Sequence, residues 1–209
     1  MKELTSLALE KAMKLGASYA DIRIVDKRQE SIRTKNGNVE SMTSSRSKGF
    51  GVRVLFDGAW GFSSSSTVTP SEIERIAQEA VEIAKASATV KRGRDIVLAP
   101  QQPVTASWES KLKVDPFEVK AEDKIKVLLE ADRLMRSNKG VRVATGNISA
   151  LREEKVFAST EGSYIEQVKT ETGAGIEATA ADKGELQRRS YPNSAGGDFA
   201  SMGFEIVEE

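Results

Sequence analysis

Glycines and serines are concentrated in the stretch Gly49 to Ser66, GFGVRVLFDGAWGFSSSS, and both residue types can serve chemistry. Glycine-rich loops bind phosphate when their backbone N–H groups open a helix, as in the dinucleotide fingerprint and the P-loop. Here Gly49-Phe50-Gly51 lies at the start of a strand pattern, and no helix pattern follows it directly. The glycines therefore do not predict a phosphate site.

The four consecutive serines, Ser63 to Ser66, supply hydroxyl groups but no base to activate them. The chain contains no histidine, which removes the usual general base and the serine and cysteine triads, and it contains no cysteine nucleophile. Ser47 and Lys48 are adjacent, and neighbours along a strand point to opposite faces, so they cannot form a serine–lysine dyad. We expect a solvated strand end at the four serines.

The same absences limit metal chemistry. Zinc sites draw on cysteine, histidine and carboxylate ligands, and catalytic zinc sites rely mostly on histidine. The acidic residues Glu153-Glu154, Glu171 and Glu177 lack the spacing of oxygen ligands that a hard cation needs. We therefore predict no catalytic residue, no metal ligand and no cofactor in this chain.

The composition is that of an ordinary globular protein and argues against two classes of partner. The chain has 209 residues, of which 39% are apolar and 30% charged, and its 31 basic and 31 acidic side chains give a formal net charge of zero. Nucleic-acid binders usually carry a basic excess, so no nucleic-acid partner is expected. Charges interrupt the N-terminal segment and no apolar run could span a bilayer, so we expect no signal peptide, no membrane partner and a cytoplasmic location.

The stretch that begins at Gly49 is best explained as a β-hairpin. Asp57-Gly58 suits a two-residue type I′ turn, which pairs Phe56 with Ala59 and continues to Arg53 with Phe62. One face then carries Val52, Val54 and Phe56, and the other carries Arg53, Leu55, Trp60 and Phe62. One face can pack under the chain's own helices. The other is covered by a second helix or meets a partner domain, a second subunit or a peptide, and Arg53, Trp60 and Phe62 are its candidate contact residues.

Helix and strand patterns extend along the rest of the chain. The first half predicts a helix over 4–15 that Gly16 ends, two long antiparallel strands around Asn36-Gly37, the hairpin, and a helix over 70–87 with Thr69 as N-cap and Glu72 in a capping box. The expected buried stripe of this second helix is Ile73, Ile76, Ala77, Ala80, Ile83 and Ala84. Residues 91–103 are a predicted linker. The second half predicts a helix over 121–136 that buries Ile125, Leu128, Leu129 and Met135 and ends at Gly140, with strands over 104–108, 141–151, 154–159, 164–179 and 185–191.

The two halves repeat at a nearly constant offset. Gly16 matches Gly140, Asn36-Gly37 matches Glu161-Gly162, Gly49 and Gly51 match Gly173 and Gly175, and Asp57 matches Asp182. The sequence thus predicts an α+β fold in which a unit of helix plus antiparallel strands is duplicated, as 1–90 and 104–209, with long β-hairpins packed against helices. The second copy lacks a closing helix, so we expect a longer protein, and we expect its apolar tail over 190–205 to pack against something.

Six segments, spread over essentially the whole chain, carry a resemblance to a known family. They are GASYADIRI (16–24), KNGNVE (35–40), GFGVRVLFDGAWGF (49–62), TPSEIERIAQEAVEIAKA (69–86), DPFEV (115–119) and QRRSYPNSAGGDFASMGFEIVEE (187–209). Each segment alone is a strand or helix motif, and they are specific as a set. The chain resembles the N-terminal portion of the TldD/PmbA metallopeptidase family, closer to the TldD branch.

The resemblance implies a longer protein whose N-terminal part is an α+β domain and whose C-terminal part binds catalytic zinc through an H-E-x-x-x-H motif and a further ligand. It implies cytoplasmic homodimers or TldD–PmbA heterodimers that cleave unfolded or small peptides, and the family's older naming refers to modulation of DNA gyrase. This chain has no histidine, so no metal ligand carries over. The C-terminal catalytic domain is expected outside residues 1–209.

Two functions follow for this chain. The first is the N-terminal substrate-channel and dimerisation domain of a TldD-like zinc-dependent peptidase that acts in proteolysis of peptides, a domain that is inactive alone. Its expected partners are its own C-terminal catalytic domain, a second subunit and the peptide substrate. The alternative is a stand-alone module that binds proteins or peptides without catalysis.

Overall fold

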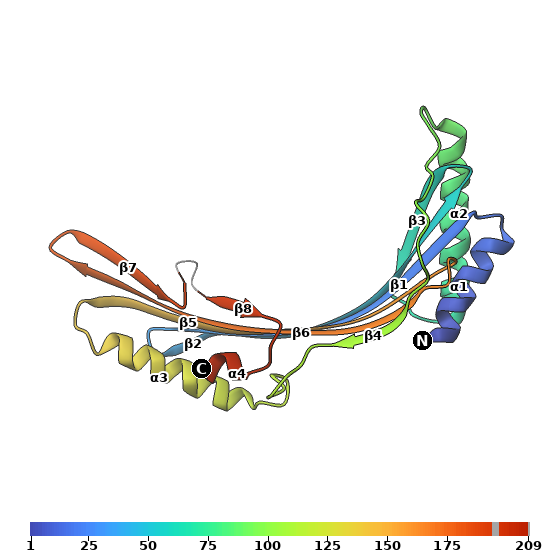
Figure 1. The fold of residues 1–209 in the computed structure, drawn as a ribbon. Helices are drawn as coiled ribbons and strands as arrows, with labels where there is room; N and C mark the ends of the chain where they lie inside the picture. Colours follow the sequence, from blue (N-terminus) through green and yellow to red (C-terminus); the bar gives the residue numbers. More distant parts are fainter. Residues whose placement is uncertain (194–196, 209) are drawn as a thin grey trace. The chain divides into compact units, whose positions relative to one another are not determined.

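The computed structural model describes residues 1–193 and 197–208, which form four helices and eight strands (Figure 1). The helices are α1 (Lys2–Lys14), α2 (Pro70–Val90), α3 (Ala121–Arg136) and α4 (Glu205–Glu208). The strands are β1 (Tyr19–Lys35), β2 (Asn38–Phe56), β3 (Ala59–Ser65), β4 (Thr105–Glu109), β5 (Val141–Ser159), β6 (Tyr164–Asp182), β7 (Glu185–Tyr191) and β8 (Asp198–Ala200). The predicted α+β class is confirmed.

The strands form one sheet in the order β3-β2-β1-β5-β6-β4, and β7 and β8 also pair with β6. In both halves of the chain a helix is followed by two long strands and a short strand, and β1 and β5 are neighbours at the middle of the sheet. The element order fits the predicted duplication, which itself stays a prediction.

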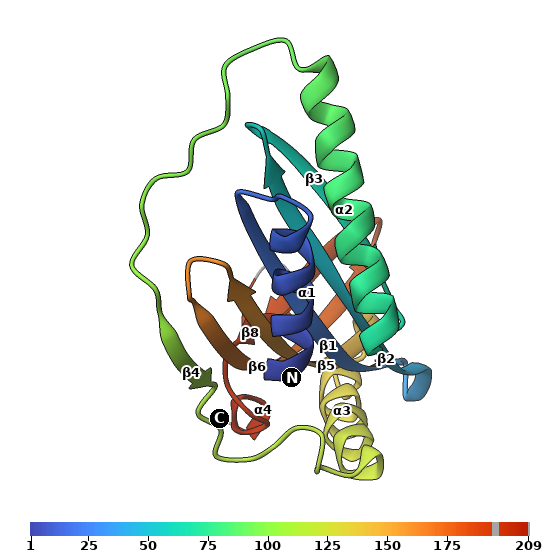
Figure 2. The same cartoon turned by 90° about the vertical axis from the view of Figure 1, so that its right-hand side faces the viewer.

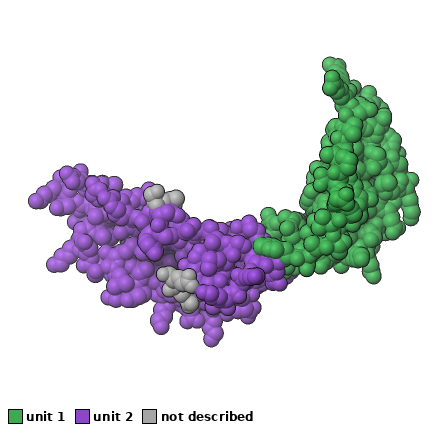
Figure 3. Space-filling view, viewed as in Figure 1, with its two compact units in different colours: residues 1–27, 47–108, 153–168 green, residues 28–46, 109–152, 169–209 purple. Residues whose placement is uncertain are grey.

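The chain divides into two compact units that do not coincide with the predicted halves (Figure 3). Unit 1 comprises residues 1–27, 47–108 and 153–168, and unit 2 comprises residues 28–46, 109–152 and 169–209. The long strands β1, β2, β5 and β6 each contribute one part to unit 1 and another to unit 2. A sequence repeat consists of consecutive residues. A compact unit consists of the residues that pack together, so each long strand is divided between two units.

Tight turns join the hairpins as predicted. Asn36 and Gly37 have φ of 49° and 79°, and Asp57 and Gly58 have φ of 44° and 66°, the values of type I′ turns. The turn between β6 and β7 has the same geometry, but it uses Lys183 and Gly184, at φ 46° and 86°. The predicted match of Asp57 with Asp182 is therefore wrong by one residue, because Asp182 is the last residue of β6.

The core of unit 1 lies between the sheet and the helix pair α1 and α2, which lie side by side, with α2 packed along β3 (Figure 2). Its fully buried side chains come from alternate strand positions and from one stripe of each helix, because successive strand residues point to opposite faces. They include Ala8, Ala12, Ile22, Ile24, Val52, Val54, Ile73, Ile76, Ala77, Ala80 and Ala84. The predicted stripe of α2 is right except at Ile83, which is 40% exposed, while Val81 is buried in its place. Ala8 and Ala12 of the predicted α1 face are buried.

The core of unit 2 is smaller and contains Ile32, Leu128, Ile148 and Phe204. The predicted stripe of α3 is only partly right. Leu128 is buried, but Ile125, Leu129 and Met135 are only partly so, and the polar Lys124 and Asp132 are buried in their place. Ion pairing explains the difference, since Lys124 Nζ lies 3.0 Å from the Glu30 carboxylate of β1 and Asp132 lies 3.4 Å from Arg136.

Two long strands are continuous where the sequence predicted breaks. The predicted strands over 141–151 and 154–159 are one strand, β5, and the hairpin strand from Gly49 is the end of β2. Two charged residues stand where the break was predicted, and both are paired: Arg152 Nη2 donates to Asp115 at 2.7 Å, and Glu153 pairs with Lys27 at 2.9 Å. Such pairs let a polar stretch remain in a sheet.

Helix α2 begins where the sequence predicted, but the predicted capping hydrogen bonds do not form. Thr69 is the N-cap of α2 and Pro70 its first residue, yet no side-chain capping bond forms. Glu72 instead binds Arg75 at 2.8 Å, and this bond, with one to Ser65, lowers the pKa of Glu72 to about 2. Helix α3 ends at Ser137 rather than at Gly140, whose φ is not positive, whereas Gly16 has φ 94°.

The predicted linker 91–103 contains no helix or strand, and the segment that follows β7 packs as expected in part. Phe204 is buried in the core of unit 2, and β8 pairs with β6, while Tyr191 and Phe199 are exposed; the predicted tail also covers 194–196, which lie outside the described residues. Among residues 1–193 and 197–208, none of the helices combines the length and the apolar character that crossing a bilayer requires.

Candidate functional site

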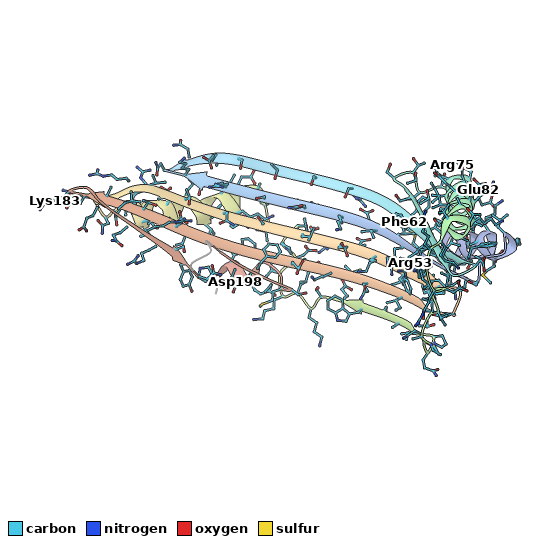
Figure 4. The ribbon with its side chains drawn as sticks, turned by 90° about the horizontal axis from the view of Figure 1, so that it is seen from above. Arg53, Phe62, Arg75, Glu82, Lys183 and Asp198 are labelled. Atoms are coloured by element: carbon cyan, nitrogen blue, oxygen red, sulfur yellow. The ribbon has the colours of Figure 1, made fainter. Side chains whose placement is uncertain are left out.

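The hairpin of β2 and β3 places the three candidate contact residues where the sequence predicted. Its register pairs Arg53 with Phe62, Val54 with Gly61, Leu55 with Trp60 and Phe56 with Ala59, so the predicted register is confirmed. Val52 and Val54 face α1 and α2 and are fully buried. Arg53, Trp60 and Phe62 lie on the opposite side of the sheet in unit 1, which we call the open face (Figure 4).

On the open face, side chains near the Asp57-Gly58 turn are buried, and side chains farther from the turn are accessible to solvent. Leu55 is 5% exposed and Trp60 is half-buried, whereas Phe62 is 57% exposed. A single exposed apolar side chain is common on protein surfaces, so the case for a binding surface depends on the groups around Phe62.

A buried carboxylate organises the centre of the open face. Asp21, on β1, is fully buried and binds two arginines: Arg23 Nη1 donates to Oδ1 at 2.9 Å, and Arg53 Nε donates to Oδ2 at 2.8 Å. Arg53 Nη2 also lies 2.6 Å from Oδ2. One carboxylate thus holds two guanidinium groups, and the cluster carries an excess of one positive charge.

Aromatic rings support both guanidinium groups. The Arg53 guanidinium lies 4.6 Å from the centre of the Trp60 ring, and the Arg23 guanidinium lies 5.0 Å from the Phe157 ring of β5. Tyr19 packs edge-to-face on Trp60 at 5.9 Å. Each arginine is therefore held both by Asp21 and by a ring, which restricts its orientation while its side chain stays accessible.

Tyr19 completes the cluster as a neutral donor. Burial is the largest cause that raises its pKa, and the charge of Asp21 and a hydrogen bond to it raise the pKa further, to about 12. The phenol therefore stays protonated across the physiological range. It can donate to Asp21, but it cannot serve as a general base at neutral pH.

Next to this cluster, the open face has a shallow hollow of about 490 Å³. Gly49 and Gly51 leave its floor without side chains, and the Phe62 ring lies over Gly51, with Cε2 2.7 Å from where a Cβ would stand. Three cations, Arg23, Lys27 and Lys48, line the hollow together with the apolar side chains of Val25 and Phe62, and its lining includes no carboxylate. The Phe50 side chain points to the other face and is buried in the core of unit 1. The arrangement suits binding of a ligand that is partly apolar and negatively charged.

The described part of the chain does not fit a catalytic metal. The whole sequence lacks histidine and cysteine, and no three carboxylates gather among residues 1–193 and 197–208 in a way that could hold an ion. The acidic residues named in the sequence analysis are engaged elsewhere: Glu153 pairs with Lys27, Glu171 with Lys169 and Glu177 with Arg188. Zinc therefore does not fit these residues, and no hydrolytic step is assigned to them.

Sequence reasoning named Arg53, Trp60 and Phe62 as candidates, which they remain, and it did not name Asp21, Arg23 and Tyr19 beside them. A signal was present in the segment YADIRI, where Tyr19, Asp21 and Arg23 alternate with the core residues Ala20, Ile22 and Ile24. The alternation places the three polar residues on one face. It could not show that β1 lies beside β2, so that Asp21 meets Arg53.

Comparison with known proteins gives matches over most of the chain. Residues 20–84 match the family model of PmbA/TldA metallopeptidase domain 1, and residues 114–209 match that of the PmbA/TldA metallopeptidase central domain. A metalloprotease of Methanocaldococcus jannaschii is 29% identical over 201 residues, which cover 96% of this chain and 43% of that relative. The chain thus spans less than half the length of this relative.

Solved structures show the same fold. TldE of Thermococcus kodakarensis superposes with a TM-score of 0.69 at 14% identity, over 98% of this chain and 46% of its own. A Thermotoga maritima protein, described as a candidate modulator of a DNA gyrase, superposes with a TM-score of 0.70 at 17% identity, over 99% of this chain and 46% of its own. At such identities the likeness concerns the fold alone.

Proposed function

Because this chain belongs to the PmbA/TldD metallopeptidase family, we propose that it is the N-terminal, non-catalytic part of a TldD-like zinc-dependent peptidase. In this proposal it shapes the substrate channel and the subunit contact, and the zinc is bound by a C-terminal catalytic domain of the same protein. Two observations together carry the proposal: the chain belongs to a metallopeptidase family, and its sequence contains no histidine or cysteine that could bind zinc. The length of the curated relative supports it, since this chain corresponds to 43% of that protein.

The open face is the part of the chain that we propose for contact with peptide or partner. Arg53, Trp60 and Phe62 are its contact residues, and β3 is an edge strand of the sheet. A peptide that adds a strand at such an edge is held by main-chain hydrogen bonds, so the binding tolerates many sequences. This property suits an enzyme that cleaves unfolded or small peptides in the cytoplasm, as a homodimer or as a TldD–PmbA heterodimer.

The same surface is compatible with the alternative function, a module that binds proteins or peptides without catalysis. The observation that favours it is the exposure of Phe62 beside the hollow, which is independent of any catalytic domain. The balanced charge of the chain gives no support to nucleic acid as the partner.

A reconstitution experiment tests the proposal. The 209-residue chain is mixed or co-expressed with the C-terminal part of the protein, and cleavage of a fluorogenic peptide is measured with and without 1,10-phenanthroline. Neither part alone should cleave, the combination should cleave, and the chelator should abolish cleavage. Activity of the 209-residue chain alone that survives the chelator would refute the proposal, and a failure of the combination to cleave would favour the alternative.

A matched pair of variants then tests the role of the open face. Phe62→Ser removes an exposed ring from this face, and Leu186→Ser removes a side chain of similar exposure, 69%, from β7 in unit 2. Phe62→Ser should weaken peptide cleavage or subunit association in the reconstituted enzyme, whereas Leu186→Ser should leave both near the wild-type level. Equal behaviour of the two variants would remove the open face from the proposal.

A further inference from the structure

The hydrogen bonds of the Asp21 cluster leave binding capacity unused. Arg23 and Arg53 bond to Asp21, and Arg53 also bonds to Tyr19; these bonds occupy only part of the N–H donors of the two guanidinium groups. The Arg23 and Arg53 side chains are 47% and 41% exposed, so a ligand can reach them. Because Asp21 neutralises only one of the two, the cluster attracts one further negative charge.

The shape of the cluster favours a planar anion. A guanidinium group presents parallel N–H donors whose spacing matches the two oxygens of a carboxylate, and such pairs are often bidentate. Asp21 and the rings of Trp60 and Phe157 hold both groups before any ligand arrives. Restricting the donors in advance reduces the entropy that binding must overcome.

The hollow beside Arg23 indicates that the ligand also carries an apolar group. Its volume of about 490 Å³ lies within the range of small-ligand pockets, and the side chains of Val25 and Phe62 offer an apolar lining that accepts an apolar side chain. The cations Lys27 and Lys48 have partners of their own, Glu153 and Asp26. The uncompensated charge is therefore that of the two arginines, next to an apolar hollow.

We propose that Arg23 and Arg53 bind a carboxylate group of a peptide, and that the adjacent hollow receives a neighbouring apolar side chain of the same peptide. The inference rests on the proposed function, because it names the chemistry by which the open face recognises peptide. A C-terminal carboxylate and an acidic side chain present the same group to the arginines, and the experiment separates them.

The test measures binding of short peptides to the 209-residue chain by the fluorescence of Trp60. Trp108 is the only other tryptophan of the sequence, so a Trp108→Phe background makes the signal report on Trp60, which touches Arg53. The probes are acetyl-Leu-Phe with a free carboxylate, its C-terminal amide, acetyl-Leu-Glu amide, and inorganic phosphate. We expect the free acid to bind at least about tenfold more tightly than the amide, since a hydrogen-bonded charge is lost with the carboxylate.

Arg23→Gln is the main variant, because the bonds between Asp21 and Arg53 remain and the fold is retained. Arg133→Gln is the matched control, an exposed arginine on α3 that also pairs with a carboxylate, Glu130. Arg23→Gln should weaken binding of the acid about tenfold and leave the amide unchanged, and Arg133→Gln should change neither. Should Arg23→Gln unfold, Arg23→Lys takes its place and should show an intermediate loss, because lysine keeps the charge without the fork geometry.

Each outcome decides the inference. Preference for the free acid assigns a C-terminal carboxylate, and equal preference for acetyl-Leu-Glu amide assigns any peptide carboxylate. Preference for acetyl-Leu-Glu amide alone assigns an acidic side chain. Equal binding of all three peptides, an unaffected Arg23→Gln, no binding of any peptide, or binding of phosphate alone would each overturn the inference. Those results leave the reconstituted cleavage assay untouched, so a failure here is distinguishable from a failure of the proposed function.

Discussion

Two hairpins of this molecule have nearly the same geometry and very different surroundings. The hairpin of β2 and β3 in unit 1 and that of β6 and β7 in unit 2 each contain seven paired positions around a type I′ turn. Yet β3 alternates between buried and exposed residues, whereas nearly every residue of β7 is exposed. The difference arises from α2, which packs along β3, so turn chemistry sets the shape of a hairpin and a covering helix sets its burial.

The largest effect on stability is expected from a change at the contact between β3 and α2. A Cβ on Gly61 would stand 2.1 Å from the Ala80 carbonyl oxygen and 2.4 Å from the Ala84 nitrogen, so the helix must move away. We expect Gly61→Ala to reduce the free energy of unfolding by about 3 kcal/mol or more, measured by urea denaturation. The matched change is at Gln187, the corresponding residue of the β6–β7 turn register and an exposed one. Gln187→Ala should cost less than about 0.5 kcal/mol, and equal losses would contradict the assigned role of α2.

A second contrast concerns ion pairs. Asp21 in unit 1 is fully buried and holds two arginines, whereas Glu177 in unit 2 pairs with one exposed arginine, Arg188. Asp21→Asn leaves two guanidinium groups beside a neutral amide, and we expect a loss of about 2–3 kcal/mol in unfolding free energy, toward the low end for buried pairs because the arginines are exposed. Glu177→Gln should cost about 0–1 kcal/mol. Thermal unfolding of both variants provides the measurement, and a reversed order would show that the Asp21 cluster does not stabilise unit 1.

Acid should act on unit 2 through Glu205. Its buried carboxylate accepts backbone hydrogen bonds from Lys113, Val114 and Gly203 at 3.0–3.2 Å, and these bonds outweigh the effect of burial and lower its pKa from 4.5 to about 2. A lowered pKa contributes stability that is present above about pH 4.5 and is lost as the pH falls toward 2. Glu205→Gln should cost about 2 kcal/mol at pH 7 and should flatten the acid side of the stability profile. An unchanged acid profile in the variant would exclude Glu205 as the titrating group.

Alkali should act on unit 1 through Tyr19. Its pKa rises from 10.0 to about 12, so the folded state keeps the proton in a range where the unfolded chain loses it. The stability from this group is complete below pH 10 and is lost as the pH rises to 12. Tyr19→Phe should cost about 1 kcal/mol at pH 7 through the lost hydrogen bond, and it should reduce the slope above pH 10. The slope does not vanish, because Tyr164 has a pKa raised to about 12 by burial and by Glu166. A steeper slope in the variant would refute the assignment.

Local signals predicted most elements of the fold. Asn36-Gly37 and Asp57-Gly58 fixed two hairpins and the register from Arg53 to Phe62, and apolar periodicity located α3 at its observed bounds. Errors occurred where a distant residue decides the local outcome. Lys124 is buried because Glu30 compensates its charge, and β5 continues through Arg152 because Asp115 and Thr170 bind it.

Some residues of the candidate site could also be predicted from local sequence, and others could not. Arg53, Trp60 and Phe62 could be predicted because a hairpin's turn sets which residues share a face. Asp21 and Arg23 could not be connected to them, since no local pattern states that β1 lies beside β2 in the register that brings Asp21 to Arg53. The hollow at Gly49 and Gly51 likewise depends on the Phe62 ring that lies over Gly51.

The sequence by itself determined the type I′ turns at Asn36-Gly37 and Asp57-Gly58, the amphipathic helices and the family, and its lack of histidine and cysteine determined that the usual zinc ligands are absent. These properties depend on neighbouring residues or on composition. The tertiary structure decided which hairpin is covered, which carboxylate is buried, and that two arginines share it. The physical reason is that burial and ion pairing depend on residues far apart in the chain, whose positions only the assembled sheet and helices fix.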